Sequence, residues 1–394
     1  MSNAILTLKP GKEQSLQRYH PWIFSGAIKR INGEPAEGDL VEVVDSRDNF
    51  LAIGHFQPSS ISVRVVSFVK QEINSHFWKA KLQQALTLRK GLGFYPSDST
   101  NIFRLVHGEG DGLPGLIIDI YGKTAVMQAH SLGMYRLREL FAQLVLEIMG
   151  GKVTSVYDKS SGTISYKSPI SAEDGYIAGI PEECELMENG NRFLVSWKDG
   201  QKTGFFVDQR ENRQLLSKYC KNAKVLNAFC YTGGFSVYAA RGGAKSIVSI
   251  DSSEKAIDLT EINMEINFGK DSNHRAISVD VFDFLRDDKE IYDVIVLDPP
   301  AFAKHKPALK NALQAYKRLN AAAFRKLNRG GILFTFSCSQ VVAREEFRNA
   351  VFSGAVIANR GVRILHQLTQ PADHPINIYH PEGEYLKGLV LFAE

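Results

Sequence analysis

The stretch VLNAFCYTGGFSVYAARGGAKSIVSID, residues 225–251, decides the fold class. It begins and ends with short, nearly continuous apolar runs, which are typical of strands buried on both faces of a parallel sheet. Similar runs recur at YDVIVLD and GGILFTFS, and helical segments lie between them. One of these segments, SEKAIDLTEINMEIN, places Leu259, Ile262 and Ile266 on one face. The alternation of strands and helices predicts a doubly wound α/β domain from about residue 191.

The first turn of this domain predicts a ligand site, because open α/β sheets bind ligands at the carboxyl ends of their strands. Gly233 and Gly234 let the backbone approach a ligand, and Asp251 ends the second strand, where a carboxylate can bind both ribose hydroxyls. The turn is not G-x-G-x-x-G, so a pyrophosphate cradle and NAD are not indicated. S-adenosylmethionine, a nucleoside cofactor without phosphates, fits better. The alternative is an ordinary strand-to-helix turn that contains glycines.

Two further aspartates follow strands of the predicted sheet. Asp280, in ISVDVFDFL, either holds an adenine amino group or caps the helix that begins near Val281, which is the commoner use of such an aspartate. Asp298 is followed by two prolines, which end the strand rigidly and remove backbone donors. This arrangement predicts recognition of a flat base that carries an amino group, with Phe302 stacked on it. The alternative is a turn that only ends the strand.

The last predicted strand of this series ends in Ser337-Cys338-Ser339. Cysteine is among the most buried residue types, so a small core residue is the first interpretation of Cys338. The second is a nucleophile at the end of a strand, which needs access and a lowered pKa. The stretch by itself leaves both interpretations open.

Length and cysteine content set the broad class. The chain has 394 residues, more than one hydrophobic core usually serves, so two or three domains are expected. Its four cysteines match neither a zinc motif nor a disulfide framework, which favours a reducing cytosol. No apolar run approaches a membrane span, and the N-terminal stretch does not resemble a secretory signal. The expected location is therefore the cytoplasm.

Charge is unevenly distributed, although the net charge is only +4. Residues 299–344 contain nine Lys or Arg and no Asp or Glu, and the first 32 residues contain five Lys or Arg and one Glu. Two such regions suit a polyanion such as RNA. The alternative for either region is a solvated helix face.

The first part of the chain predicts a nucleic-acid-binding module. GDLVEVVDSRDNFLAIGHF and SISVRVVSFV are β-branched runs separated by turns, so residues 1–72 predict a small β-rich unit. The basic N-terminal segment of this unit contains Arg18, His20 and Trp22. Compact basic β-modules with aromatic residues often bind nucleic acid. The alternative is a structural cap with Trp22 in its core. Residues 73–190 predict a mixed unit, with helices over HFWKAKLQQALTLRKGLG and GMYRLRELFAQLVLEIMGG.

An ordered set of motifs resembles one family. KTGFFVDQRENR (202–213), LNAFCYTGGFSVYAARGGA, DVIVLDPPAFAKHK, TFSCSQ, ADHP (372–375) and PEGEYLKG (381–388) are similar to motifs of the RlmI-type class I methyltransferases. These enzymes make 5-methylcytosine in large-subunit (23S) ribosomal RNA. RYHPWIFSGAI resembles the PUA domain of that family, and RLVHGEGDGLPGLIIDIYG resembles its central domain. The resemblance covers essentially the whole chain.

The resemblance implies three domains and a covalent mechanism. The domains are a PUA-like RNA-binding domain (1–72), a central α+β domain of EEHEE type (73–190) and a Rossmann-like domain that binds S-adenosylmethionine (191–394). Cys338 takes the position of the catalytic cysteine, whose thiolate adds to carbon 6 of cytosine and makes carbon 5 nucleophilic. Only about 3% of a free thiol is ionised at pH 7, so the basic stretch around Cys338 is expected to lower its pKa. Asp298 is expected to hydrogen-bond the cytosine amino group or ring nitrogen.

Other site residues follow from the same resemblance. The expected cofactor-binding residues lie in the loop before the first strand and at the strand ends: Lys202, Thr203, Phe206, Asp208, Gln209, Arg210, Asn227, Phe229, Tyr231, Thr232, Gly233, Asp251, Ser252, Asp280, Val281, Asp298 and Pro299. The expected substrate-binding residues are Pro300, Phe302, Lys304, Lys306, Arg18, His20 and Trp22. Asp373, His374 and Glu382 are expected to shape the same pocket.

The base that removes the carbon 5 proton stays open. Some RNA cytosine methyltransferases have a second cysteine directly after the prolines, but this position is Ala301. Cys184, Cys220 and Cys230 receive no role.

Two other functions stay open from the sequence. A methyltransferase of another RNA base atom, such as an exocyclic amine or guanine N7, would use Asp-Pro-Pro without a thiol. A non-catalytic RNA-binding or ribosome-assembly protein would keep the fold without binding S-adenosylmethionine. Nothing in the sequence indicates a metal site, and a homodimer is compatible with it but not required.

Overall fold

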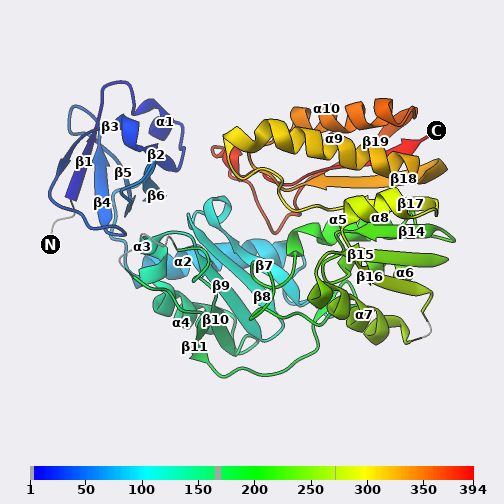
Figure 1. Cartoon of the computed structure of the whole chain (residues 1–394). Helices are drawn as coiled ribbons and strands as arrows, with labels where there is room; N and C mark the ends of the chain where they lie inside the picture. Colours follow the sequence, from blue (N-terminus) through cyan, green and yellow to red (C-terminus); the bar gives the residue numbers. More distant parts are fainter. Residues whose placement is uncertain (1–3, 165–169, 271) are drawn as a thin grey trace. The chain divides into compact units, whose positions relative to one another are not determined.

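Figure 1 shows the computed structural model, which describes residues 4–164, 170–270 and 272–394. The chain forms two compact units, and each is described by itself. The first unit comprises Met1–Met187, Val195–Val207 and Ala372–Gly383, and the second comprises Glu188–Leu194, Asp208–Pro371 and Glu384–Glu394. The chain therefore passes between the units several times, and the motif at 202–213 contributes to both.

The first unit begins with a sheet in the order β2-β6-β5-β4-β1-β3. β-Branched residues alternate along β4, so that Val41 and Val43 enter a core that they share with Leu6 and Val63. This confirms the β-rich unit that the two apolar runs predict. The elements are β1 (Ala4–Leu8), α1 (Gln14–Gln17), β2 (Trp22–Phe24), η1 (Ser25–Ala27), β3 (Ile28–Asn32), β4 (Leu40–Val44), β5 (Phe50–Phe56) and β6 (Ile61–Ser67).

A second sheet of the first unit has the order β11-β10-β9-β8-β7. Helices α2 and α4 contribute Trp78, Leu82 and Phe141 to the core beside this sheet. The second predicted helix is divided in two, because Leu137 has φ −94° and ψ 2° and separates α3 from α4. The elements are α2 (Ser75–Gly91), β7 (Ile102–His107), η2 (Gly108–Asp111), β8 (Leu116–Tyr121), β9 (Thr124–Ala129), α3 (Leu132–Arg136), α4 (Arg138–Ile148), β10 (Ser155–Asp158) and β11 (Gly175–Gly179).

The second unit is built on a seven-stranded sheet in the order β16-β15-β14-β17-β18-β20-β19. The strands from β14 to β18 run parallel, and β20 lies antiparallel between β18 and β19. This confirms the doubly wound α/β prediction. The strands are β14 (Lys224–Ala228), β15 (Ser246–Asp251), β16 (His274–Ser278), β17 (Tyr292–Leu297), β18 (Leu327–Ser337), β19 (Val362–Leu368) and β20 (Lys387–Ala393), with a separate pair β12 (Met187–Glu188) and β13 (Asn191–Arg192).

Helices cover both faces of this sheet: in Figure 1, α9 and α10 lie on one side and α7 on the other. Among the described helices, none is both long and apolar enough to cross a membrane. The helices are α5 (Arg210–Ser217), α6 (Gly234–Arg241), α7 (Glu254–Phe268), α8 (Val281–Asp287), α9 (Leu309–Arg325) and α10 (Arg344–Ile357), and the short turns are η3 (Val207–Gln209), η4 (Lys306–Ala308) and η5 (Pro381–Gly383).

Helix α7 packs with a different face from the one that its apolar residues suggest. Ile262 and Ile266 are exposed, whereas Thr260, Asn263 and Met264 are buried. The two buried polar side chains hold the turn after β14 by hydrogen bonds. The inner face of α7 is therefore partly polar, and its polar side chains bind the backbone of the turn after β14.

Candidate active site

Three strand ends of the second unit meet where the order of its sheet reverses. β14 lies between β15 and β17, and ligands bind outside the carboxyl ends of strands at such a point. The register pairs Ala228 with Leu297, and Leu297 with Thr335. The structure therefore brings together the residues that follow β14, β17 and β18, among them Phe229, Asp298 and Cys338.

The turn after β14 has an unusual backbone. Phe229, Tyr231 and Gly233 all adopt left-handed conformations, with φ of 60°, 49° and 77°. The Thr260 hydroxyl donates to the Tyr231 carbonyl at 2.9 Å, and the Asn263 amide donates to the Thr232 carbonyl at 2.9 Å. Non-glycine residues are uncommon in this conformation and cluster at functional sites, so the turn is a candidate ligand-binding loop.

Glycine is required at position 233 for a second reason. A Cβ atom there would lie 2.7 Å from Thr260 Cγ2, which is closer than atoms can pack. Sequence reasoning found the glycine but missed Thr260 and Asn263, because a polar residue in a helix gives no signal until its partner is known.

Several residues of this site carry buried oxygens that have no hydrogen-bond partner. Within the described part of the chain, they include Asp208 Oδ1, Asn227 Oδ1 and Thr232 Oγ1. The other oxygen of Asp208 accepts a hydrogen bond from the Tyr385 hydroxyl at 2.6 Å. Buried polar atoms normally have partners, so these three suggest that a polar ligand completes the site.

The aspartates at the ends of β15 and β16 have backbone partners. Asp251 accepts hydrogen bonds from the Tyr231 and Ser253 amides, both at 3.0 Å, so it ties the turn after β14 to the end of its own strand. Asp280 Oδ1 accepts from the Phe282 and Asp283 amides, at 2.8 and 3.1 Å, and caps α8. Of the two interpretations of Asp280, the helix cap is therefore present in the structure. Val281, the residue after Asp280, is buried, and Ser252, the residue after Asp251, is exposed.

The carboxyl group of Asp298 has a perturbed pKa. Burial raises this pKa to about 7, and the neighbouring Asp208 carboxylate also raises it, whereas a hydrogen bond from Gln209 and the charge of Arg213 lower it. A carboxyl group with this pKa exchanges its proton near neutral pH. It can therefore donate a hydrogen bond as well as accept one.

The loop after Asp298 divides into a buried and an exposed part. Pro299 is buried and Pro300 is exposed, and the Phe302 ring packs on Tyr316 at a centroid distance of 4.8 Å. Phe302 is half-buried, so its contact with Tyr316 occupies part of the ring that stacking on a base would use. Lys304 and Lys306 are exposed.

Cys338 is held beside this loop rather than in the core. It is half-buried, and its Sγ lies 3.9 Å from the Pro299 carbonyl oxygen. The Ser339 hydroxyl donates to the Ala303 carbonyl at 2.6 Å, which fixes the turn after β18 against the Asp-Pro-Pro loop. Cys220 and Cys230 are buried instead, and burial raises the pKa of each thiol to about 12.

Helix α5 contributes a buried ion pair next to the site. The Arg213 guanidinium binds both oxygens of Glu188, at 2.9 and 2.6 Å, and the Tyr238 hydroxyl donates to the same carboxylate at 3.0 Å. Gln209 and Arg210, at the start of this helix, are also buried.

Comparisons with known proteins agree with this geometry. Residues 6–68 match the model of the PUA-like domain family, and residues 163–351 match that of S-adenosylmethionine-dependent methyltransferases. The ribosomal RNA large subunit methyltransferase I of Aeromonas hydrophila is 42% identical over 100% of both chains, and that of Escherichia coli is 39% identical over 97% of this chain and 98% of its own. The chain belongs to the ribosomal RNA large subunit methyltransferase I family.

A solved structure supports the fold of this methyltransferase. The crystal structure of SMU.776 in complex with SAH is 24% identical, covers 100% of both chains and has a TM-score of 0.85. S-adenosylmethionine is the cofactor of the family to which the chain belongs. The unpartnered oxygens fit this molecule, because a carboxylate suits its ammonium group and the amide and hydroxyl oxygens suit its other polar groups.

The motif at 202–213 of the methyltransferase is shared between the units. Its first part belongs to the first unit, where the Thr203 hydroxyl donates to Asp119 at 2.6 Å and contacts the Tyr121 hydroxyl at 3.0 Å. Thr203 is buried, and its hydroxyl is already used within that unit. Lys202 is exposed and Phe206 is half-buried. Of the predicted motif, the structure therefore places the residues from Asp208 onward with Asp298.

Two residues of the ADHP motif are core residues of the first unit. Asp373 accepts a hydrogen bond from the Arg104 amide at 2.9 Å, and its other oxygen lies 3.0 Å from His374 Nδ1. The Arg89 guanidinium also donates to the Asp373 carbonyl at 2.7 Å. Both residues of the motif are fully buried, so they stabilise the first unit from inside.

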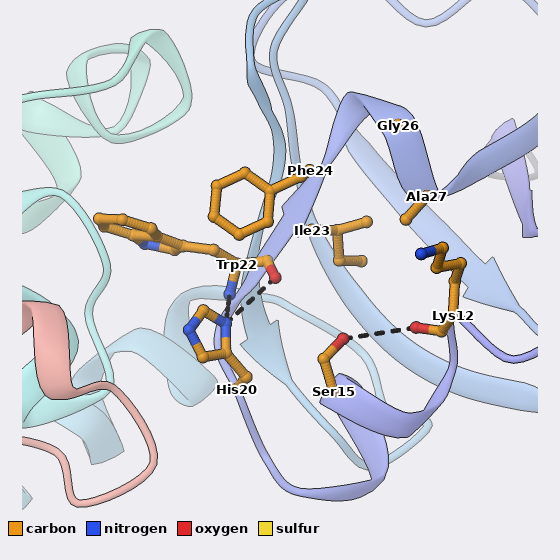
Figure 2. A pocket seen from close by; sticks show the side chains of 8 residues that line it. All are labelled: Lys12, Ser15, His20, Trp22, Ile23, Phe24, Gly26 and Ala27. Carbon is orange, nitrogen blue, oxygen red and sulfur yellow. Dashed lines mark hydrogen bonds between the residues drawn. The ribbon is translucent and has the colours of Figure 1, made fainter.

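Two of the three predicted RNA-binding residues of the first unit, His20 and Trp22, border a hollow of about 370 Å³. Figure 2 shows His20 and Trp22 in its wall beside Phe24. The Trp22 indole donates to Glu109 at 2.8 Å and packs on His380 at 4.3 Å between ring centroids, so this ring is anchored. His20 Nε2 lies 3.4 Å from the Glu382 carboxylate, and Arg18 is exposed and does not line the hollow.

Proposed function

We propose that this chain methylates carbon 5 of a cytosine in large-subunit ribosomal RNA through a covalent adduct with Cys338. One observation carries the proposal: the half-buried Cys338 contacts the carbonyl of the residue that follows Asp298, whose pKa is raised, at the strand ends where the sheet order reverses. Membership of the ribosomal RNA large subunit methyltransferase I family supports ribosomal RNA as the substrate.

The proposed reaction uses the two side chains in turn. The Cys338 thiolate adds to carbon 6 of cytosine, and the protonated carboxyl of Asp298 donates to the ring nitrogen, which takes up the electron pair. The electron pair then makes carbon 5 nucleophilic, and S-adenosylmethionine supplies the methyl group as an electrophilic sulfonium. Transfer of the carbon 5 proton to a water molecule then expels the thiolate and restores the double bond, and the Asp298 carboxylate takes back its proton from the ring nitrogen. The products are 5-methylcytosine and S-adenosylhomocysteine.

We further propose how the chain holds the cofactor. Asp208 binds the ammonium group, and the left-handed turn formed by Phe229, Tyr231, Thr232 and Gly233 presents backbone groups to the rest of the molecule. The buried oxygens of Asp208, Asn227 and Thr232 support this assignment. Asp251 and Ser252 are proposed to border the ribose, and Val281 to border the adenine.

We expect Asp208→Asn to weaken binding of S-adenosylhomocysteine by about tenfold or more, because a buried hydrogen bond to a charged group is lost. The Tyr385 hydroxyl can still donate to the asparagine oxygen, so the fold is retained. Isothermal titration calorimetry measures the affinity. Asp283→Asn, at an exposed carboxylate on α8, serves as the control and leaves the affinity unchanged. Equal affinities of the two variants would contradict the role of Asp208.

RNA is proposed to be bound by both units. Lys304 and Lys306 follow the Asp-Pro-Pro loop, are exposed and would contact phosphates beside an unstacked base. The hollow beside His20 and Trp22 would bind a second RNA segment. In this proposal residues 1–72 act as the RNA-binding module, residues 73–190 as the central domain and residues 191–394 as the catalytic domain.

Nucleoside mass spectrometry tests the proposed function. Ribosomal RNA from cells that lack the protein is incubated with the enzyme and labelled S-adenosylmethionine. We expect labelled 5-methylcytidine. Labelled product of another kind would show that a different base atom is methylated, and binding of the cofactor without any labelled nucleoside would contradict catalysis on this RNA.

A further inference from the structure

A buried lysine lies next to the turn that carries Cys338. Lys387, the first residue of β20, is only 3% exposed and is paired with Ser337 in the sheet register. Its Nζ donates a hydrogen bond of 2.7 Å to the carbonyl oxygen of Ser339. The lysine therefore contacts the chain on both sides of the proposed nucleophile.

The hydrogen-bond acceptor of the Lys387 ammonium is an uncharged group, the Ser339 carbonyl. Its hydrogen bond goes to a backbone carbonyl, which leaves its positive charge to act on the surroundings. Burial and the charge of Arg344 lower the pKa of Lys387, whereas Glu384, Cys338 and Glu346 raise it, and the resulting pKa is about 8. Arg344 already pairs with Glu384, and Glu346 accepts a hydrogen bond from the Ala343 amide. The lysine is therefore still mostly protonated at pH 7.

Two other titratable groups near Cys338, Tyr316 and Asp298, do not supply a positive charge. Tyr316, on α9, interacts with Cys338, but burial raises its pKa to about 12, so it is neutral at pH 7. Asp298, at the end of β17, is either neutral or negative. A cation at close range stabilises a thiolate, and Lys387 is a buried cation that interacts with Cys338 and binds the carbonyl of the next residue.

We propose that Lys387 is a positioning residue that fixes the turn Ser337–Ser339 and holds Cys338 in the thiolate form. The inference rests on the proposed function, because a thiolate is needed there only for covalent catalysis. A free thiol with a pKa of about 8.5 is only a few per cent ionised at pH 7, and a cation at close range increases this fraction. Above pH 8 the lysine loses its proton and this contribution disappears.

The rate of Cys338 alkylation by iodoacetamide, followed by peptide mass spectrometry from pH 5 to 10, tests the proposal. It needs neither RNA nor cofactor, so its outcome is independent of the methylated nucleoside. The pH at which the alkylation rate reaches half its maximum is the midpoint for Cys338. In Lys387→Met, which keeps the length of the side chain but removes its charge, we expect this midpoint to rise by about one pH unit and the alkylation rate at pH 7 to fall about tenfold. Lys387→Arg keeps the charge and is expected to retain a low midpoint.

Two measurements separate this role from a structural one. Lys326→Met removes another lysine whose ammonium donates to a backbone carbonyl, that of Asp288, and is expected to leave the midpoint of Cys338 unchanged. Affinity for S-adenosylhomocysteine, unchanged in Lys387→Met, shows that the site is folded. Equal midpoints in wild type and Lys387→Met would overturn the proposal. If Lys387→Met does not fold, a wild-type midpoint at or above about 8.5, the value of a free thiol, overturns it instead.

Discussion

Replacing Cys338 with alanine is expected to lower the rate of 5-methylcytidine formation by at least about a thousandfold, because the reaction loses its nucleophile. The binding of S-adenosylhomocysteine is expected to remain, since the unpartnered oxygens of the cofactor site lie on other residues. The half-buried side chain is small, so its truncation leaves little empty space and the fold is retained. Single-turnover methylation of ribosomal RNA, with nucleoside mass spectrometry as the readout, measures the loss.

Cys184→Ala is the matched control, because Cys184 is exposed and belongs to the first unit. It is expected to methylate at the wild-type rate. RNA that carries 5-fluorocytosine at the target position gives an independent check, since fluorine cannot leave as a proton does and the adduct with the wild-type enzyme persists. A Cys338→Ala enzyme that methylates as fast as wild type would show that the thiol takes no part in the chemistry.

Asp298→Asn is expected to slow methylation by about a hundredfold or more at pH 7, which is the usual contribution of a positioned acid. The pKa of this carboxyl is raised to about 7, so below pH 7 it carries the proton that the ring nitrogen needs, and above pH 7 it progressively loses it. The wild-type rate is therefore expected to fall on the alkaline side. In the asparagine variant this fall disappears, because the amide does not titrate.

The control for this variant lies at the other end of the same strand. Asp293 accepts a hydrogen bond from the Lys224 amide at 2.8 Å, far along β17 from the proposed site. Asp293→Asn keeps an acceptor there and is expected to retain the wild-type rate and its pH dependence. A pH profile of Asp298→Asn with an unchanged alkaline fall would show that another group is the acid.

The sequence predicted the strands of the catalytic sheet well, because runs such as YDVIVLD are apolar enough to be buried on both faces. The resemblance to RlmI-type methyltransferases implied that Asp298 and Cys338 act on the same base, and in the structure both residues follow parallel strands. The sequence left the helix cap by Asp280 open as one of two interpretations, and the inner face of α7 could not be predicted from it. Each depends on which backbone groups lie opposite a polar side chain, and this is decided by tertiary packing.

The sequence also did not predict that the 202–213 motif is divided between the two units. A continuous motif suggests one site, but Thr203 is bonded to Asp119 in one unit and Asp208 to Tyr385 in the other. Lys387 gave no signal for a similar reason. A lysine in a glycine-rich C-terminal motif is ordinary until the sheet register places it opposite Ser337.

The left-handed turn after β14 has a consequence for how this enzyme can change. Phe229 and Tyr231 each carry a conformational cost of about 1–3 kcal/mol that glycine would not have. Glycine would remove this cost at both positions, but at position 229 it would also lose the packing of the Phe229 ring on the core, and the resulting backbone would be freer to leave its present shape. If the turn binds the cofactor as proposed, the cost of these two conformations is met before the ligand arrives, so less of the binding free energy is spent on ordering the loop.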